Sequence, residues 1–249
     1  MILTALGIDS MEFDLKRQTE LLRHLGILHG WLIDTGTGGY RRDDVCESAA
    51  ILDKLVDRDV PLVQYRGLSF GPLMADAFLR GKAPFKYECE SWTPNLDVAM
   101  DYVGKKALAG GVRIVSKKKH SKNEIILDLS GLIPVLKITV RELKKADKIG
   151  DLQREEIGPA GYTVFDMLLK NMQSLARTIK RLKESEYLVH PRPYTLKDVF
   201  RMRFDYGFEE YKPSETARLR SILAKTGRSI DEVIGKWLQF EKGKIVSVS

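Results

Sequence analysis

The stretch PLVQYRGLSF, residues 61–70, decides the fold prediction because it combines a buried strand with an arginine. Mostly apolar residues run from Leu62 to Tyr65, as in a strand that packs inside a core. Arg66 follows directly, and a guanidinium is costly to bury without a partner. Two explanations stay open: a structural carboxylate partner, or a phosphate that the planar guanidinium binds with two hydrogen bonds while Gly67 lets the ligand approach the backbone.

Amphipathic helices are predicted before this strand. Apolar residues recur three and four positions apart over residues 11–28 and 43–58, and Asp43 or Asp44 is a suitable N-cap for the second helix. The segment DTGTGGY, residues 34–40, has the glycines of a phosphate loop without the strand-turn-helix context, so we expect a turn there. After the strand, we expect a helix over residues 72–80, a strand over 85–92 and a helix from about Asn95.

The second half of the chain is predicted to pass from strands to helices. Residues 111–140 contain three runs rich in strand-forming residues, GVRIVS, NEIILDLSG and VLKITV, with the lysine cluster KKKHSK as a solvated hairpin tip between the first two. Helices are expected over residues 166–184 and 195–240. The sequence therefore predicts an α+β fold, with a core domain over residues 1–165, including the N-terminal helices, and a basic helical C-terminal region over residues 166–249.

Composition indicates a globular protein, because 43% of its 249 residues are hydrophobic and both charge signs are abundant. No stretch approaches the roughly 20 apolar residues of a membrane helix, and residues 1–10 lack the basic leader of a signal peptide. We therefore expect a cytoplasmic protein without a membrane partner. Cys46 and Cys89 are not in a CxxC spacing and the four histidines show no ligand spacing, so no metal site is predicted.

The positive charge is concentrated near the C-terminus. Residues 166–249 hold 17 lysines and arginines against 11 acidic residues and contribute +6 to the net charge of +7, whereas residues 1–165 contribute only +1. A clustered positive field attracts nucleic acid or acidic protein surfaces, although solvated helix faces also have this composition.

A second informative stretch is ESWTPNLDVAMDYV, residues 90–103. Side chains alternate along a strand, so Ser91 and Thr93 share one face while Trp92 takes the other. The two hydroxyl groups either border a polar ligand or end the strand and cap the following helix, and Thr93 can do both.

Three separated stretches together resemble the mono-ADP-ribosyltransferase family, in its arginine-serine-glutamate class of bacterial and phage toxin-like enzymes. ILDKLVDRDVPLVQYRG resembles the helix and first core strand, which ends in aromatic-Arg-Gly. ESWTPNLDVAMDYV resembles the Ser-x-Ser/Thr signature, and LQREEIGP resembles the third, an E/Q-x-E followed by aliphatic residues. The resemblance covers residues 45–165 and implies a mixed, split β-sheet core.

The resemblance also implies NAD as co-substrate and a set of residue roles. Arg66 with Gly67 would bind the NAD phosphates, and Ser91, supported by Thr93, would orient the catalytic glutamate. An aromatic ring that stacks on nicotinamide would come from Trp92 or Tyr102. Cleavage of the nicotinamide–ribose bond passes through an oxocarbenium-like transition state, which a carboxylate stabilises as the positive charge develops.

Three carboxylates are candidates for the catalytic role. Glu156 comes directly before Ile157, as the family's glutamate precedes aliphatic residues, whereas Glu155 forms a QxE pair with Gln153. The glycines and proline after Ile157 do not extend a central strand. Glu124, in KNEIILDL, is the third candidate because the residues that follow it form a more regular strand pattern than those after Glu156.

The acceptor of ADP-ribose is predicted to be a nucleic acid, RNA or single-stranded DNA. Arginine-modifying members have a glutamate where this chain has Gln153 or Arg154, which disfavours arginine as acceptor, and the basic C-terminal region suits a polyanion. The alternatives are a protein side chain other than arginine, or a catalytically inactive nucleic-acid-binding or structural protein with a transferase-like fold.

Overall fold

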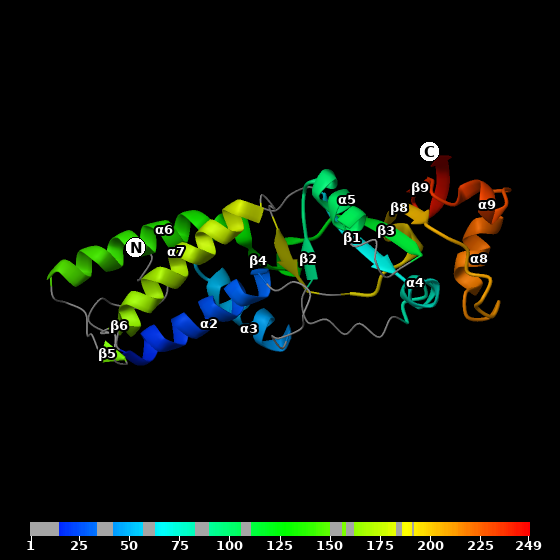
Figure 1. Cartoon of the computed structure of the whole chain (residues 1–249). Helices are drawn as coiled ribbons and strands as arrows, with labels where there is room; N and C mark the ends of the chain where they lie inside the picture. Colours follow the sequence, from blue (N-terminus) through cyan, green and yellow to red (C-terminus); the bar gives the residue numbers. More distant parts are fainter. Residues whose placement is uncertain are drawn as a thin grey trace. The chain divides into compact units, whose positions relative to one another are not determined.

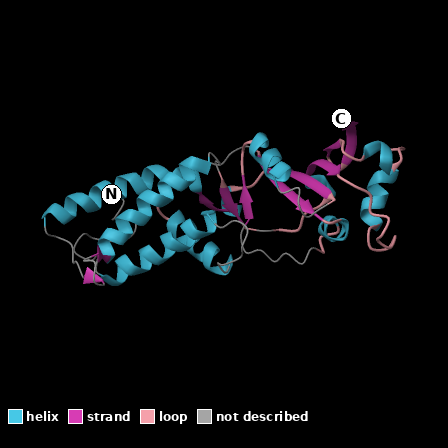
Figure 2. Ribbon diagram, in the orientation of Figure 1, coloured by secondary structure: helices cyan, strands magenta, loops and turns pink. Residues whose placement is uncertain are grey.

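The computed structural model describes residues 15–33, 42–56, 63–82, 90–105, 111–149, 156–157, 162–182, 186–190 and 192–249, and its helices and antiparallel sheets confirm the predicted α+β class (Figures 1 and 2). The chain divides into two compact units. The first comprises Met1–Val60, Glu88–Ser91 and Ser121–His190, and the second comprises Pro61–Tyr87, Trp92–His120 and Pro191–Ser249. The domain boundary predicted between residues 165 and 166 falls inside a helix of the first unit.

The first unit is built mainly from helices. They are α2 (Leu15–Ile33), α3 (Arg42–Asp53), α6 (Leu129–Ile149) and α7 (Val164–Leu182), with α2 and α6 each lying against α7 (Figure 1). Apolar residues spaced three or four apart turn one face of each helix into a shared core. In α2 and α7 these buried residues are Leu21, Leu25, Leu28, Leu32, Leu168, Met172, Leu175 and Ile179.

Two small sheets complete the first unit. One has the strand order β2-β7-β4, formed by β2 (Glu90–Trp92), β7 (Tyr187–Val189) and β4 (Ile125–Asp128). The short helix η2 (Lys122–Glu124) precedes β4. The other sheet pairs β5 (Glu156–Ile157) with β6 (Tyr162–Thr163). The chain passes into the second unit within β2, between Ser91 and Trp92.

The second unit contains a five-stranded antiparallel sheet of order β1-β3-β8-β9-β10. Its strands are β1 (Gln64–Phe70), β3 (Val112–Lys118), β8 (Val199–Phe204), β9 (Trp237–Glu241) and β10 (Lys244–Val248). The helices of this unit are α4 (Pro72–Leu79), α5 (Leu96–Lys105), α8 (Ala217–Ala224) and α9 (Ile230–Val233), with the short helix η3 (Leu196–Asp198).

The side chains of β1 alternate between two environments. Tyr65 packs toward the cluster of Ala99, Val103 and Val115, which joins α5 to the sheet, and Gly67 also faces α5. Alternation puts Gln64, Arg66 and Phe70 on the opposite face. There Gln64 contacts His120 and Phe70 contacts Phe78.

The prediction of a strand over VLKITV is wrong, because residues 135–140 lie within α6, which also contains Pro134. Leu132, Leu136, Thr139 and Leu143 are buried at spacings of four, three and four residues. This helical periodicity outweighs the strand propensity of the β-branched residues.

Two further predictions about the secondary structure are corrected. The lysine cluster KKKHSK is no hairpin tip between paired strands, since Lys117 and Lys118 belong to β3 and the following β4 lies in a different sheet. The helical region predicted over residues 195–240 contains strands β8 and β9. In β8, Val199, Met202 and Phe204 are buried, because this strand lies inside the sheet with β3 and β9 as neighbours.

Candidate functional site

Arg66 lies in the middle of β1, opposite Ser116 of β3. Its neighbour Tyr65 is joined to Thr93 by two backbone hydrogen bonds: the Tyr65 N–H donates to the Thr93 carbonyl at 2.6 Å, and the Thr93 N–H donates to the Tyr65 carbonyl at 2.9 Å. The second unit therefore brings two of the sequence-predicted positions, Arg66 and Thr93, onto adjacent backbone segments.

The side chain of Thr93 takes part in the turn that begins α5. Its Oγ1 accepts a hydrogen bond from the Asn95 N–H at 3.1 Å, and the Asn95 side chain accepts one from the Asp97 N–H at 2.9 Å. Thr93 is 5% exposed. The Thr93 hydroxyl therefore stabilises the turn ahead of α5, whereas the side chain that accepts from the first turn of the helix is that of Asn95; a contact of Thr93 with cofactor stays a prediction.

Gly67 has a packing function that the sequence did not indicate. A Cβ at this position would overlap the carbonyl oxygen of Ala99 and lie 3.0 Å from Cγ1 of Val103, both in α5. The missing side chain therefore lets α5 lie close to β1, and this face of Gly67 is covered by protein rather than open to a ligand.

The two aromatic candidates for nicotinamide stacking differ in burial. Trp92 is 1% exposed; its ring lies edge-on to His120 at 4.6 Å and stacks on Tyr194 at 5.9 Å. His120 in turn shares a 2.5 Å hydrogen bond with the Gln64 side chain. Trp92 is thus a core residue, so the nicotinamide role is not retained for it. Tyr102, on α5, is 42% exposed.

Ser91 lies on β2 in the first unit, and β2 is hydrogen-bonded to β7. In this unit, β7 is therefore the strand that main-chain pairing brings beside β2. Glu186 directly precedes Tyr187, the first residue of β7. Its carbonyl oxygen accepts a hydrogen bond from the Leu129 N–H at 3.1 Å.

The three predicted carboxylates occupy other positions. Glu155 lies outside the described residues, and Glu156 begins β5, opposite Thr163 in the two-stranded sheet rather than in the sheet of β2. The Glu124 carboxylate accepts hydrogen bonds from the backbone N–H and the hydroxyl of Ser121 at 2.7 and 2.9 Å. Glu124 therefore caps the short helix η2.

Sequence reasoning missed Glu186, although a signal was present. The stretch ESEYLV, residues 184–189, has two glutamates separated by one residue and followed by a tyrosine and two aliphatic residues. The residues after this second glutamate form a strand of three residues, Tyr187–Val189, whereas β5 has two, Glu156–Ile157. Glu184 and Ser185 lie outside the described residues.

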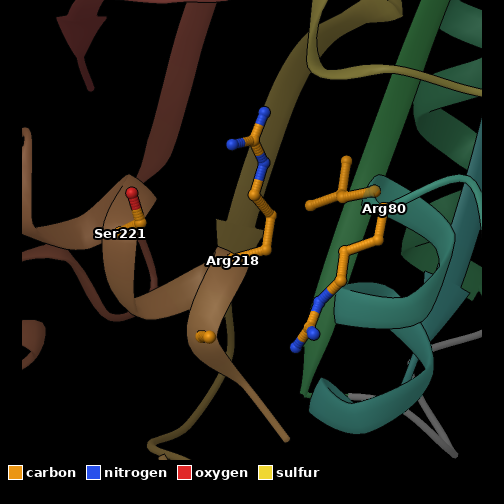
Figure 3. Close-up of a pocket in the computed structure, with 5 residues that line it drawn as sticks. Arg80, Arg218 and Ser221 are labelled. Carbon is orange, nitrogen blue, oxygen red and sulfur yellow. The ribbon is translucent and has the colours of Figure 1, made fainter. Parts of the chain in front are cut away.

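A pocket of about 510 Å³ in the second unit is lined by Leu79, Arg80, Ala217, Arg218 and Ser221, from α4 and α8 (Figure 3). The two guanidinium groups point in opposite directions (Figure 3). Arg80 is paired with Asp76, whose other oxygen accepts a hydrogen bond from the Leu219 N–H at 2.9 Å. These contacts join α4 to α8, so the pair is structural.

The described residues contain no group of three or more His, Cys, Asp or Glu arranged to hold a metal ion. None of the described helices combines the length and the apolar character needed to cross a bilayer. Comparison with family models, with curated proteins and with solved structures gives no match for this chain.

Proposed function

We propose that this protein is an ADP-ribosyltransferase that uses NAD and that Glu186 is its catalytic glutamate. The observation that carries the proposal is the strand order β2-β7-β4, in which the strand that contains Ser91 neighbours the strand that Glu186 precedes. In the resembled family the serine orients the glutamate, and neighbouring strands supply that relation. β5, which begins at Glu156, is not a member of this sheet.

A second observation, in the second unit, also supports the transferase proposal. Tyr65, next to Arg66, is bonded through its backbone to Thr93, two residues after Ser91. Thr93 is thus adjacent, by main-chain pairing, to the strand that carries Arg66. Three short motifs that match a family in chain order and are also connected by strand pairing are stronger support than any single motif.

The proposed chemistry assigns one task to each residue. The Arg66 guanidinium binds the diphosphate of NAD with charge-assisted hydrogen bonds. The bond between ribose C1′ and the nicotinamide nitrogen breaks, and its electron pair leaves with the nicotinamide. The Glu186 carboxylate stabilises the positive charge that develops on the ribose. An acceptor oxygen or nitrogen then bonds to C1′ and releases one proton to solvent.

The test is release of nicotinamide from NAD by the purified protein, measured by liquid chromatography. We expect slow release by the wild type without added metal, because water can act as acceptor. Arg66→Ala should abolish release, and Glu186→Gln should slow it about a thousandfold because a group that acts mainly in the transition state is lost. Circular dichroism melts of both variants control for folding.

The matched control is Glu156→Gln. It makes the same change at the other candidate glutamate, which is followed by Ile157 as Glu186 is followed by Tyr187, but it should alter the rate by less than about threefold. If Glu156→Gln is the severe variant and Glu186→Gln the mild one, the placement of the third signature on β7 is wrong. If a folded wild type releases no nicotinamide and labels no component of a cell lysate, the enzyme proposal itself fails.

A further inference from the structure

The second unit contains a strongly basic pocket of about 420 Å³ at one end of its five-stranded sheet. Five lysines line it, accompanied by a single carboxylate. They are Lys117, Lys118, Lys119, Lys197 and Lys242, with Glu241. From the sequence, the first three were predicted to lie at a hairpin tip, and the C-terminal helices were predicted to carry the basic surface.

The lysines converge from three separate parts of the chain. Lys117 to Lys119 end β3, and Lys197 lies in η3, ahead of β8. Lys242 forms, with Gly243, the two-residue turn between β9 and β10; both have positive φ, 49° and 79°, as such turns require. A Cβ on Gly243 would lie 3.6 Å from Cγ of Lys197, so this turn packs directly against η3.

Gathering these cations around one pocket costs electrostatic energy. Like charges repel one another, and the residues that line this pocket include five lysines and one glutamate. Aromatic rings hold two of the ammonium groups: Lys117 lies over Phe200 at 5.0 Å, and Lys118 lies over Tyr194 at 5.6 Å. An arrangement that keeps several cations beside a cavity is favourable when an anion occupies that cavity.

We propose that this pocket binds the phosphate backbone of a single-stranded nucleic acid. A volume of about 420 Å³ is within the usual range for a small-molecule site and admits one nucleotide unit. Phe200, half-buried, lines the same pocket. Lysines that contact successive phosphates beside an aromatic side chain are the combination that single-strand-binding proteins use.

The position of the pocket on the sheet relates it to the proposed chemistry. Lys117 and Lys118 pair across the strands with Tyr65 and Gln64, the two residues that precede Arg66. Two residues along a strand span about 7 Å. The pocket therefore lies at the start of the strand that carries the proposed phosphate-binding arginine, and a nucleic acid bound there is the acceptor that we propose for ADP-ribose. That acceptor role rests on the proposed transferase function, whereas binding does not.

The experiment measures binding of a fluorescein-labelled 12-nucleotide single-stranded RNA by anisotropy, without NAD, over a series of salt concentrations. The pocket variant is K119A/K197A/K242N, in which asparagine suits the positive φ at position 242. The control variant is K212A/K225A/K236A, which removes the same charge from exposed lysines of the same unit that do not line the pocket.

We expect the pocket variant to bind at least tenfold more weakly and the control variant to stay within about threefold of wild type. The slope of log K against log salt should fall in magnitude by about 2 in the pocket variant, since each lost contact to a single strand removes about 0.7. Equal losses in both variants, or no RNA binding by the wild type, would overturn the pocket assignment. So would displacement of the RNA by polyglutamate at the same charge concentration.

A second measurement separates binding from chemistry. With radiolabelled NAD, the wild type and the control variant should label the RNA, and the pocket variant should label it at least tenfold less. If the pocket variant loses RNA binding but the wild type labels no RNA, the binding site stands and the acceptor role is refuted. Nicotinamide release by the wild type then shows whether the transferase proposal fails as well.

Discussion

The substitution Gly67→Ala tests whether β1 is held against α5 as the structure describes. The added Cβ would overlap the Ala99 carbonyl oxygen and approach Cγ1 of Val103 to 3.0 Å. A helix carbonyl cannot rotate away, so α5 must shift, and overpacking of this kind costs about 1–3 kcal/mol. Replacing glycine in a strand recovers about 0.5–1 kcal/mol of backbone entropy. The expected net loss in the free energy of unfolding is therefore about 1–2 kcal/mol.

The matched control is Gly104→Ala in α5, because a Cβ there meets no atom within 4 Å. It should stabilise the unit by about 0.5–1 kcal/mol, the usual gain for glycine to alanine in a helix. Two of the three tryptophans, Trp92 and Trp237, lie in the second unit, so urea unfolding followed by fluorescence in a Trp31→Phe background reports on this unit alone. Linear extrapolation gives both free energies.

The result that refutes the packing argument is a Gly67→Ala protein as stable as Gly104→Ala. If that stable variant had also lost NAD binding, Gly67 would be a ligand-contact residue, as the sequence first suggested. Loss of stability with NAD binding retained below the unfolding transition would establish the packing role.

Two further predictions concern stability. Burial, with a smaller effect of Arg23, lowers the pKa of His24 below 6.5. As the pH drops, the unfolded chain therefore binds a proton that the folded chain does not. The free energy of unfolding should fall as the pH drops from about 7.5 and level off below the folded pKa. His24→Gln should reduce this dependence in urea melts at pH 7.5 and 5.5; an unchanged dependence would exclude His24 as its source. Asp76→Ala should cost about 3 kcal/mol because it leaves an arginine and the Leu219 N–H without their buried partner, whereas the exposed Asp97→Ala should cost less than about 1 kcal/mol. Equal costs in thermal melts would contradict the structural role of Asp76.

A helix with a clear start signal was predicted from the sequence, whereas strand β8 was not. Residues 72–80 were predicted as a helix and form α4, where Pro72 starts the helix. The prediction of a helix over residues 195–240 failed at β8, although Phe200, Met202 and Phe204 alternate with two arginines in the two-residue period of a strand. Its burial depends on neighbours in the sheet, which local sequence does not specify.

The sequence predicted the secondary structure around those candidate residues that lie in a clear local pattern. Arg66 and Ser91 lie on strands, as expected. The third signature was predicted at residues 153–157 from its order in the chain, and order does not determine which strand pairs with β2. The three-residue strand β7 begins only five residues after α7 ends, and so short an element has weak periodicity. Its position beside β2 follows from strand pairing, which is seen in the structure and not in the local sequence.

Net charge counted along the chain does not show which basic residues gather in space. Residues 166–249 contain most of the excess positive charge, yet the basic pocket takes three of its lysines from residues 117–119. Strand pairing brings β3 beside β8, and β8 beside β9, so that lysines about 80 and 125 positions apart line one cavity. The same pairing of β3 with β1 puts Lys117 and Lys118 opposite Tyr65 and Gln64, the two residues before Arg66. A polyanion held there would be presented to the proposed NAD-binding arginine by the sheet itself, so acceptor binding and phosphate binding would share one rigid element.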